Sequence, residues 1–381
     1  MYANKQFAYR NLSSHSLTLA VIIKKRKTEM KQIIITCFLL LLSGIVYGQN
    51  SKTWTAFYNK DSTLIGYKDN LGNVRIEPKF QYFTHAKKFE HIIAVTDENY
   101  KSYYLTKSGR IIGRDSLHFF DNTPDCESGG FIRFKDYKTD KVGAFNRNGD
   151  IVIPAEYNNL TRVLNGMVVG LKNAQKEIDG EYYRFIGGVY LLIDTTNKVL
   201  IDSFKYDYNL DFYSLEVTKH LNTNKNRENF KTSNGDYYSF INYEKEFKSW
   251  LNSTLLENFT EENLINSSCR EIYYWKKFVG WTNESKESYI IRNYELMKSK
   301  LLQLKNKNCN YEIFINGHNI FMYDTLQSEG YYDNCGEPKV WKYPIMNIVI
   351  SYGKGKKFVQ DHFEFLRTDN GYKLISLTIK K

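Results

Sequence analysis

Residues 142–157 read VGAFNRNGDIVIPAEY, and this stretch decides the fold of the first half of the chain. A short apolar run enters a polar turn at Gly149, and a second β-rich run leaves the turn and reaches Pro154. Glycine accepts the positive φ that tight hairpin turns require, and proline ends a strand because it has no N–H to donate. The stretch therefore predicts a β-hairpin.

The same pattern recurs along the chain, in residues 65–80, 103–112 and 189–201. The four turn positions are occupied by residues that tolerate positive φ: Gly72, Gly109, Gly149 and Asn197. A single hairpin cannot bury its own apolar face, so neighbouring copies must stack. We therefore expect a β-repeat domain over residues 54–221, an array of stacked hairpins with a solenoid-like or propeller-like form.

The repeat resembles the WG-repeat (KWG-type) family, whose units read roughly Trp-Gly-aromatic, a turn glycine, and a proline followed by an aromatic residue. Gly66 and Gly143 stand at the signature glycine, although Ile and Val replace the tryptophan before them. The turn glycines and the prolines of two repeats also match the pattern: Gly72, Pro78, Gly149 and Pro154. The resemblance covers about residues 54–205 and implies binding or scaffolding without fixed catalytic residues.

The C-terminal part follows a different pattern. A polar, Asn- and Lys-rich stretch at residues 222–236 is the expected linker, and residues 237–381 form the second domain. Apolar residues recur at helical spacing over 243–259 and 286–305. Short β-type runs follow, and the last of them close on an Asn-Gly hairpin turn. This order predicts an α+β roll, and it is similar to the NTF2-like and cystatin-like domains, whose curved sheet often leaves a cavity.

The chain begins with a segment that reads as a secretory signal peptide. Residues 30–48 contain a basic residue after a methionine, an apolar run of about ten residues, and a cleavage site between Gly48 and Gln49. That run is too short to span a bilayer, so we expect no transmembrane helix in the mature chain. Residues 1–29 are interpreted as an upstream extension from a wrongly assigned start codon. The protein is then periplasmic, extracellular or at the cell surface.

The predicted cleavage changes the charge balance. The whole chain carries 53 basic and 42 acidic residues, a net charge of +11. Residues 49–381 keep 46 basic and 41 acidic residues, a net charge of +5, and the lysines are dispersed. Nucleic-acid binding requires a basic stripe or a recognisable module, and neither is present. We therefore expect no nucleic-acid partner.

Four cysteines remain after cleavage: Cys126, Cys269, Cys309 and Cys335. An exported protein meets an oxidising compartment, and four cysteines allow three connectivities. We favour a disulfide between Cys309 and Cys335, because both fall beside turn residues in one domain. Free thiols are the alternative.

Few residues offer chemistry. The sequence contains no metal-binding histidine pair, no P-loop, no dinucleotide-binding glycine motif and no nucleophile elbow, so we expect no metal and no cofactor. His362 and Glu364 share one face of a predicted strand and could form an acid–base pair in a cavity of the α+β domain. A solvated outer face, opposite Phe363 and Phe365, is the alternative.

Aromatic residues are dense in the second domain. Trp275, Trp281, Trp341 and Tyr343 could line a hydrophobic pocket or a platform on which sugars stack, and ordinary core packing is the alternative. The sequence thus predicts an exported, non-enzymatic binding or scaffold protein whose partner is a protein or another ligand of the cell envelope. The competing hypothesis is an enzyme or small-molecule binder that uses a cavity of the C-terminal domain.

Overall fold

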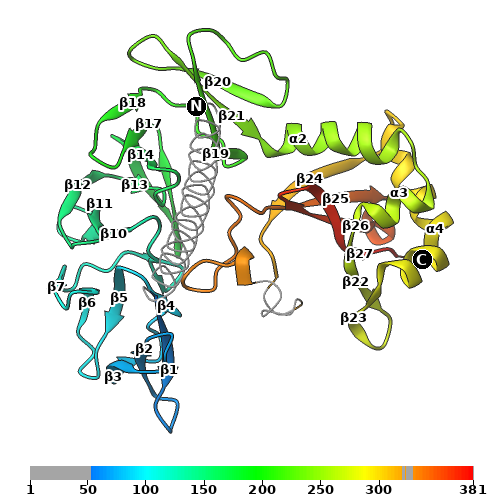
Figure 1. Cartoon of the computed structure of the whole chain (residues 1–381). Helices are drawn as coiled ribbons and strands as arrows, with labels where there is room; N and C mark the ends of the chain where they lie inside the picture. The colour runs from blue at the N-terminus through cyan, green and yellow to red at the C-terminus, as the bar shows by residue number, and fades with distance from the viewer. Residues whose placement is uncertain (1–52, 320–321, 323–328, 381) are drawn as a thin grey trace, which may run out of the picture.

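The structure is a computed structural model that describes residues 53–319, 322 and 329–380 (Figure 1). The predicted upstream extension, the signal peptide and the cleavage site at Gly48 and Gln49 lie outside these residues. Among the residues described, no helix is long and apolar enough to cross a membrane.

Residues 54–242 form five small antiparallel sheets, here called sheets 1 to 5, that follow one another along the chain. Sheet 1 contains β1 (Trp54–Tyr58), β2 (Leu64–Lys68), β3 (Val74–Gln81) and β4 (Lys88–Phe89); sheet 2 contains β5 (Ile92–Thr96), β6 (Ser102–Thr106) and β7 (Ile111–Ile112); sheet 3 contains β10 (Phe131–Asp136), β11 (Lys141–Asn146) and β12 (Ile151–Tyr157). Sheet 4 contains β13 (Asn159–Leu160), β14 (Met167–Lys172), β17 (Val189–Asp194) and β18 (Val199–Ile201); sheet 5 contains β19 (Leu210–Thr218), β20 (Arg227–Lys231) and β21 (Tyr237–Asn242). Two hairpins extend from the array, β8 (Phe119–Phe120) with β9 (Thr123–Pro124) and β15 (Gln175–Asp179) with β16 (Tyr182–Ile186).

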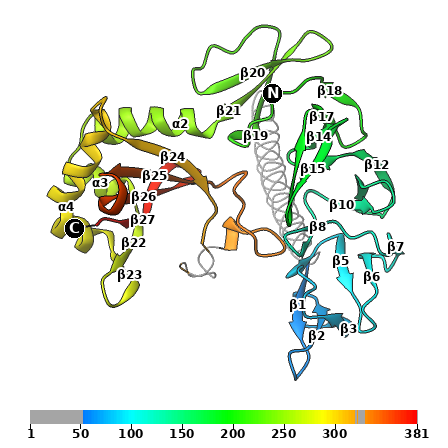
Figure 2. The same cartoon turned by 180° about the vertical axis from the view of Figure 1, so that it is seen from behind.

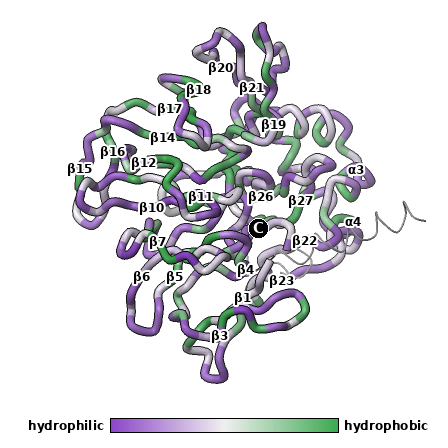
Figure 3. The backbone as a smooth tube through the Cα atoms, turned by 60° about the vertical axis from the view of Figure 1, so that its left-hand side comes forward, coloured by the Kyte–Doolittle hydropathy of each residue, from purple (hydrophilic) through white to green (hydrophobic). Residues whose placement is uncertain are grey.

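The sheets are arranged in an arc that is open on the side of the C-terminal domain (Figures 1 and 2). The strands β3, β7, β12 and β18 each form one edge of their sheet and lie on the outer rim of the arc. Hydrophilic residues occupy most of the loops at this rim (Figure 3). The four turn residues before these edge strands all have positive φ, with values of 85° at Gly72, 89° at Gly109, 83° at Gly149 and 67° at Asn197.

Each pair of neighbouring sheets shares one hydrophobic core. Tyr67 and Phe80 of sheet 1 pack with residues of sheet 2, and Tyr104 of sheet 2 packs with Phe134 of sheet 3. Sheets 3 and 4 share a third core, and sheets 4 and 5 share a fourth around Phe240. No sheet buries its apolar face alone, so the array is stabilised by stacking between consecutive repeats.

The predicted linker at residues 222–236 differs from the structure. These residues contain β20, which pairs with β21 and belongs to sheet 5. The composition indicated a linker because Asn and Lys dominate there, but Arg227 is buried and donates to the backbone carbonyl of Ser239 at 2.8 Å. The polar residues are therefore part of a paired hairpin, and the array extends to Asn242.

The C-terminal domain packs helices against one face of a six-stranded sheet with the order β23-β22-β27-β26-β25-β24. Its helices are α2 (Tyr243–Trp250), the π-helical turn η1 (Leu251–Leu256), α3 (Glu261–Asn266), α4 (Lys286–Leu301) and the 3₁₀ turn η2 (Leu302–Lys305). Its strands are β22 (Ser268–Lys276), β23 (Gly280–Ser285), β24 (Tyr311–Asn316), β25 (Ile345–Tyr352), β26 (Val359–Thr368) and β27 (Gly371–Thr378), with 3₁₀ turns η3 (Glu329–Tyr331) and η4 (Gly355–Lys357). β22 and β27 pair in parallel, and the other neighbours pair antiparallel.

One continuous core lies between the helices and this sheet. Phe247 of α2 and Met297 of α4 pack there with Phe363 and Phe365 of β26, and all four are fully buried. Capping explains where two helices begin: Asn242 accepts a hydrogen bond from the Lys245 amide before α2, and Ser285 accepts one from the Ser288 amide before α4. Because the core fills the helical side of the sheet, the residues that alternate with Phe363 and Phe365 point to the opposite face.

The signature glycines of the repeat are required by close packing. A Cβ at Gly143 would lie 2.6 Å from the Ile153 carbonyl oxygen and 2.6 Å from the Phe134 ring, and a Cβ at Gly66 would lie 2.5 Å from the Ile76 carbonyl oxygen. Both glycines coincide with a register shift between the middle strand and the rim strand. The rim strand therefore crosses directly over the glycine.

This packing predicts that Gly143→Ala lowers the unfolding free energy by roughly 1–3 kcal/mol, because the backbone atoms that a methyl group would meet cannot move aside as a side chain can. Urea denaturation of the full chain measures the change. Gly330→Ala is the matched control, since a Cβ at Gly330 meets no atom within 4 Å. Equal effects of the two substitutions would contradict the close-approach explanation.

Candidate functional site

A long connection between β24 and β25 reaches from the C-terminal domain into the open side of the arc (Figures 1 and 2). Its residues 329–344 are here called the arm. The carbonyl oxygen of Asn334 accepts hydrogen bonds from the backbone amides of Lys87 and Lys88 at 2.9 and 2.8 Å. His85 lies 3.1 Å from the Glu337 carboxylate across the same contact. The arm is thus hydrogen-bonded to the end of sheet 1.

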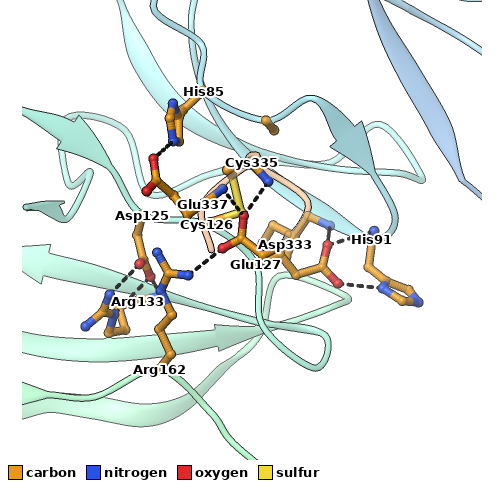
Figure 4. Close-up of a disulfide and its surroundings, with 12 residues drawn as sticks. His85, His91, Asp125, Cys126, Glu127, Arg133, Arg162, Asp333, Cys335 and Glu337 are labelled. Carbon is orange, nitrogen blue, oxygen red and sulfur yellow. Dashed lines mark hydrogen bonds and ion pairs between the residues drawn. A yellow bond between two sulfur atoms is a disulfide. The ribbon is translucent and has the colours of Figure 1, made fainter. Parts of the chain in front are cut away.

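A disulfide between Cys126 and Cys335 joins the arm to the array (Figure 4). Both cysteines are buried in the core that sheets 1 and 2 share. The structure therefore differs from the expected Cys309–Cys335 disulfide. Cys309 packs at the edge of the C-terminal core, whereas the arm carries Cys335 out of that domain.

The two remaining cysteines in the described part of the chain, Cys269 and Cys309, are free thiols. Burial raises the pKa of the Cys269 thiol to about 11 and also raises the pKa of the Cys309 thiol. The thiolate is the reactive form of cysteine, so neither is prepared to act as a nucleophile near neutral pH.

Arg162 makes the third contact between the array and the arm. Its guanidinium donates to the Asp333 carboxylate at 2.5 Å (Figure 4). The guanidinium also lies 5.3 Å from the centre of the Trp341 ring. The other oxygen of Asp333 accepts from the backbone amides of Cys335 and Glu337, both at 2.9 Å. Asp333 is almost fully buried, and these donors compensate its loss of hydration.

Three of the array residues that contact the arm occupy the same position in consecutive repeats. Lys87, Cys126 and Arg162 each precede by five residues the first residue of the next sheet's entering strand. Those first residues are Ile92 of β5, Phe131 of β10 and Met167 of β14. The partners are the consecutive arm residues Asp333, Asn334 and Cys335. Repetition of one sequence position thus forms one continuous binding surface for an extended segment.

Sequence reasoning missed this surface, although the spacing of five residues was a readable signal. The recognisable residues of each repeat lie in its turn and its rim strand, whereas the return segment before the next sheet has no residue type in common at the three equivalent positions. The side chains at the equivalent positions differ in type, so the shared feature is their place in the fold and not their chemistry.

A second contact joins the C-terminal domain to sheet 5. Arg367 of β26 lies 3.1 Å from the Asp211 carboxylate of β19, and its Nε donates to the Glu246 carboxylate at 2.8 Å. The Tyr243 hydroxyl donates to the Trp341 carbonyl oxygen at 2.6 Å. Trp341 therefore takes part in both junctions, through its ring and through its backbone.

A buried charge cluster supports the array beneath the arm. Arg133 donates to both oxygens of Asp125, at 3.0 and 2.5 Å, and to the Leu160 carbonyl oxygen at 2.7 Å. Burial would raise the pKa of Asp125, but the attraction of the Arg133 guanidinium outweighs it and holds the pKa at about 2. Burial, with the repulsion of Arg133, lowers the pKa of His118 to about 4.

One group of carboxylates and a histidine has the composition of a metal site, but its donors are already engaged. Glu127 accepts from the backbone amides of His91 and Ile92 at 3.0 and 3.1 Å, and its other oxygen lies 2.6 Å from His91 Nδ1. These contacts tie the return segment of sheet 2 to the start of β5. The geometry is that of a structural clamp between two repeats.

His362 and Glu364 lie on the face of the C-terminal sheet that is opposite the helices. They line a pocket of about 400 Å³ together with Trp281. The predicted acid–base pair and one residue of the predicted aromatic group therefore share this pocket. Glu364 accepts a hydrogen bond from the Ser376 hydroxyl, and His362 Nδ1 lies 3.5 Å from the Asn347 side-chain amide. The residues are therefore held in place on neighbouring strands of one sheet.

The predicted aromatic group does not form a single pocket. Trp275 lines a separate pocket of about 900 Å³ beside α4, and Trp281 lines the pocket of His362 and Glu364, although the centres of the two rings are only 5.9 Å apart. Trp341 and Tyr343 lie in the arm, where the Tyr343 ring packs against Tyr331. The prediction grouped these residues only because aromatic residues are dense in this part of the sequence.

Comparison with known proteins identifies one segment. Residues 143–169 match the family model described as WG containing repeat. The match begins at the signature glycine Gly143 and covers the rim strand of sheet 3 and the return to sheet 4. A search of curated proteins and a search of solved structures each gave no match. The match identifies a WG-type repeat in this segment.

The buried histidines predict a loss of stability on acidification. The pKa values of His118 and His318 are both lowered from 6.5 to about 4, so below pH 6.5 the unfolded chain binds more protons than the folded one. The unfolding free energy should fall between pH 6.5 and pH 4, by roughly 1–2 kcal/mol per histidine at pH 5. Asp125 adds a separate loss between pH 3.8 and about 2.

Urea denaturation of the wild type and of His118→Gln at pH 7 and pH 5 measures this effect. The variant should lose about half of the change that the two histidines cause. His220→Gln is the control, because His220 is exposed in the loop between β19 and β20. An unfolding free energy that is equal at the two pH values would contradict the assignment.

Proposed function

We propose that this chain is an exported, non-enzymatic binding and scaffold protein. Its WG-repeat array holds the arm, and the arm fixes the C-terminal domain so that the outer surface of that domain is presented to a ligand. One observation carries the proposal: equivalent positions of three consecutive repeats, at Lys87, Cys126 and Arg162, converge on three consecutive residues of the arm.

The chemistry of the contact supports recognition of an extended polypeptide. The array supplies backbone donors at Lys87 and Lys88, a charged side chain at Arg162 and a buried apolar wall. Backbone hydrogen bonds give affinity for any extended segment, and side-chain contacts select one sequence. Here the selected segment belongs to the same chain. The strand order of each sheet, which runs from the inside of the arc to its rim, favours a propeller-like description of the array.

Two further features support the finer parts of the proposal. Export agrees with a buried disulfide, because disulfides persist mainly in oxidising compartments. An NTF2-like description of the C-terminal domain agrees with its order of elements, in which helices precede a hairpin, another helix and a meander. Its first strand, β22, pairs in parallel with its last strand, β27.

The proposal predicts that the array holds the arm without the disulfide. In the double variant Cys126→Ser/Cys335→Ser, the backbone amides of residues 329–341 should stay protected from hydrogen exchange, because the Asn334 hydrogen bonds and the Arg162–Asp333 ion pair remain. Adding Arg162→Ala should reduce the protection at least about tenfold, since a buried carboxylate that loses its partner is strongly destabilising. Hydrogen exchange read by mass spectrometry of the full chain measures both.

Arg184→Ala in the same double variant is the matched control, because Arg184 pairs with Glu177 on an exposed hairpin away from the arm. If removal of the cysteines alone abolishes protection of the arm, the disulfide alone holds the arm on the array and the proposed binding surface is refuted.

A second candidate function rests on the pocket of His362, Glu364 and Trp281. A carboxylate and an imidazole beside an exposed ring could bind a small polar ligand or act as an acid–base pair. If the pocket is catalytic, Glu364→Gln should lower hydrolysis of chromogenic ester and glycoside substrates at least about a hundredfold. Glu312→Gln, on the exposed side of β24, is the control. The absence of turnover above the control in the wild type refutes this candidate.

A further inference from the structure

The hairpin between β22 and β23 ends in a group of exposed apolar side chains. Residues 275–281, WKKFVGW, are here called the tip. Phe278 is 94% exposed, Val279 65%, Trp275 54% and Trp281 44%. The two tryptophans face each other across the strands, with ring centres 5.9 Å apart. Both ribbon views show the hairpin projecting from the C-terminal domain (Figures 1 and 2).

Folding does not explain the residue at the apex. Phe278 has a φ of 67°, in the left-handed region that disfavours bulky side chains. The Lys277 ammonium lies 4.9 Å from the centre of its ring. A phenylalanine that strains the backbone and buries little surface lowers stability, so the fold itself gives no reason for this residue, and an exposed apolar group of this kind marks a contact with a surface outside the chain.

The charge of the tip favours one kind of surface. Lys276 and Lys277 directly precede the apex residue Phe278, and residues 275–281 contain no acidic residue. A second exposed hairpin of the same chain, β15–β16, offers a contrast. Its turn uses Gly180, with a φ of 62°, between Asp179 and Glu181, and it also carries an exposed aromatic residue, Tyr182. In that turn the residue with positive φ is a glycine and its two neighbours are acidic, whereas in the tip it is Phe278 and the preceding residues are lysines.

We propose that the tip docks on an anionic lipid surface. Phe278 and Val279 enter the boundary of the acyl chains, the tryptophans lie at the level of the headgroups, and the two lysines contact lipid phosphates. A convex group of seven residues is too small for a standard protein–protein interface, which buries about 800 Å² on each side. Insertion of a few apolar side chains, with lysines beside them, suits a bilayer.

This inference adds a partner to the binding role proposed above, and it depends on the hairpin and not on how the arm is held. Failure of vesicle binding would therefore leave the hydrogen-exchange test of the arm unaffected, and the reverse also holds.

Sedimentation of the full chain with lipid vesicles tests the proposal. Affinity for vesicles that contain phosphatidylglycerol should exceed affinity for pure phosphatidylcholine by about tenfold and should fall with added salt. Tryptophan fluorescence should shift to shorter wavelength on binding, because Trp275 and Trp281 leave water. Lys276→Gln/Lys277→Gln should remove the preference for the anionic vesicles.

Phe278→Asn is the decisive variant, because asparagine tolerates the left-handed conformation and the fold is retained. It should weaken vesicle binding at least about tenfold, while the thermal midpoint stays equal to or above that of the wild type. Tyr182→Ser on the acidic hairpin should leave binding unchanged. Absence of binding by the wild type, or equal binding by the wild type and Phe278→Asn, would overturn the proposal.

Discussion

The placement of the C-terminal domain against the repeat array depends on the contact between the arm and the array. Cys126 and Cys335 are 209 residues apart in sequence, and their disulfide closes most of the described chain into one loop. In the chain-entropy model, a loop of this length stabilises the folded state by on the order of 5 kcal/mol. The Asn334 hydrogen bonds and the Arg162–Asp333 ion pair surround the disulfide, so the covalent and non-covalent contacts restrain the same few residues. The position of the C-terminal domain follows from this contact and from the Arg367 junction.

The array can offer such a contact because its repeats do not fold independently. Each core lies between two sheets, so a residue on the return segment of one repeat has a fixed position relative to its equivalent in the next. The side chains at Lys87, Cys126 and Arg162 are unrelated in chemistry, yet they form one surface because their backbone positions repeat. A repeat array therefore allows each position of a binding surface to vary without loss of the overall geometry.

The sequence indicated the local parts of the fold and not the long-range ones. Gly149 and Pro154 predicted the hairpin of sheet 3 because turn chemistry acts over a few residues, and the helices of the second domain followed from apolar periodicity. The predicted Cys309–Cys335 disulfide rested on two cysteines beside turn residues in one domain, and it is wrong because nothing local in the sequence shows that the arm leaves that domain. The linker prediction failed at residues 222–236 because polar composition describes an exposed hairpin as well as it describes a linker.

The candidate sites divide in the same way. The alternation of β26 correctly placed His362 and Glu364 opposite Phe363 and Phe365, since side-chain direction in a strand has a period of two. The aromatic residues were grouped by density, but pairing in the sheet separates them: Trp275 and Trp281 lie at the projecting end of a hairpin, and Trp341 lies in the arm. The exposure of the tip depends on where the hairpin extends beyond its neighbours, which no local pattern reports.

Mass spectrometry of the protein isolated from its native host without reduction tests the central claim most directly. The account predicts a chain that begins at Gln49, a cross-linked peptide pair that joins Cys126 to Cys335, and alkylation of Cys269 and Cys309 without a reducing agent. A link between Cys309 and Cys335, or free thiols at Cys126 and Cys335 in a chain that retains residues 1–48, would contradict it.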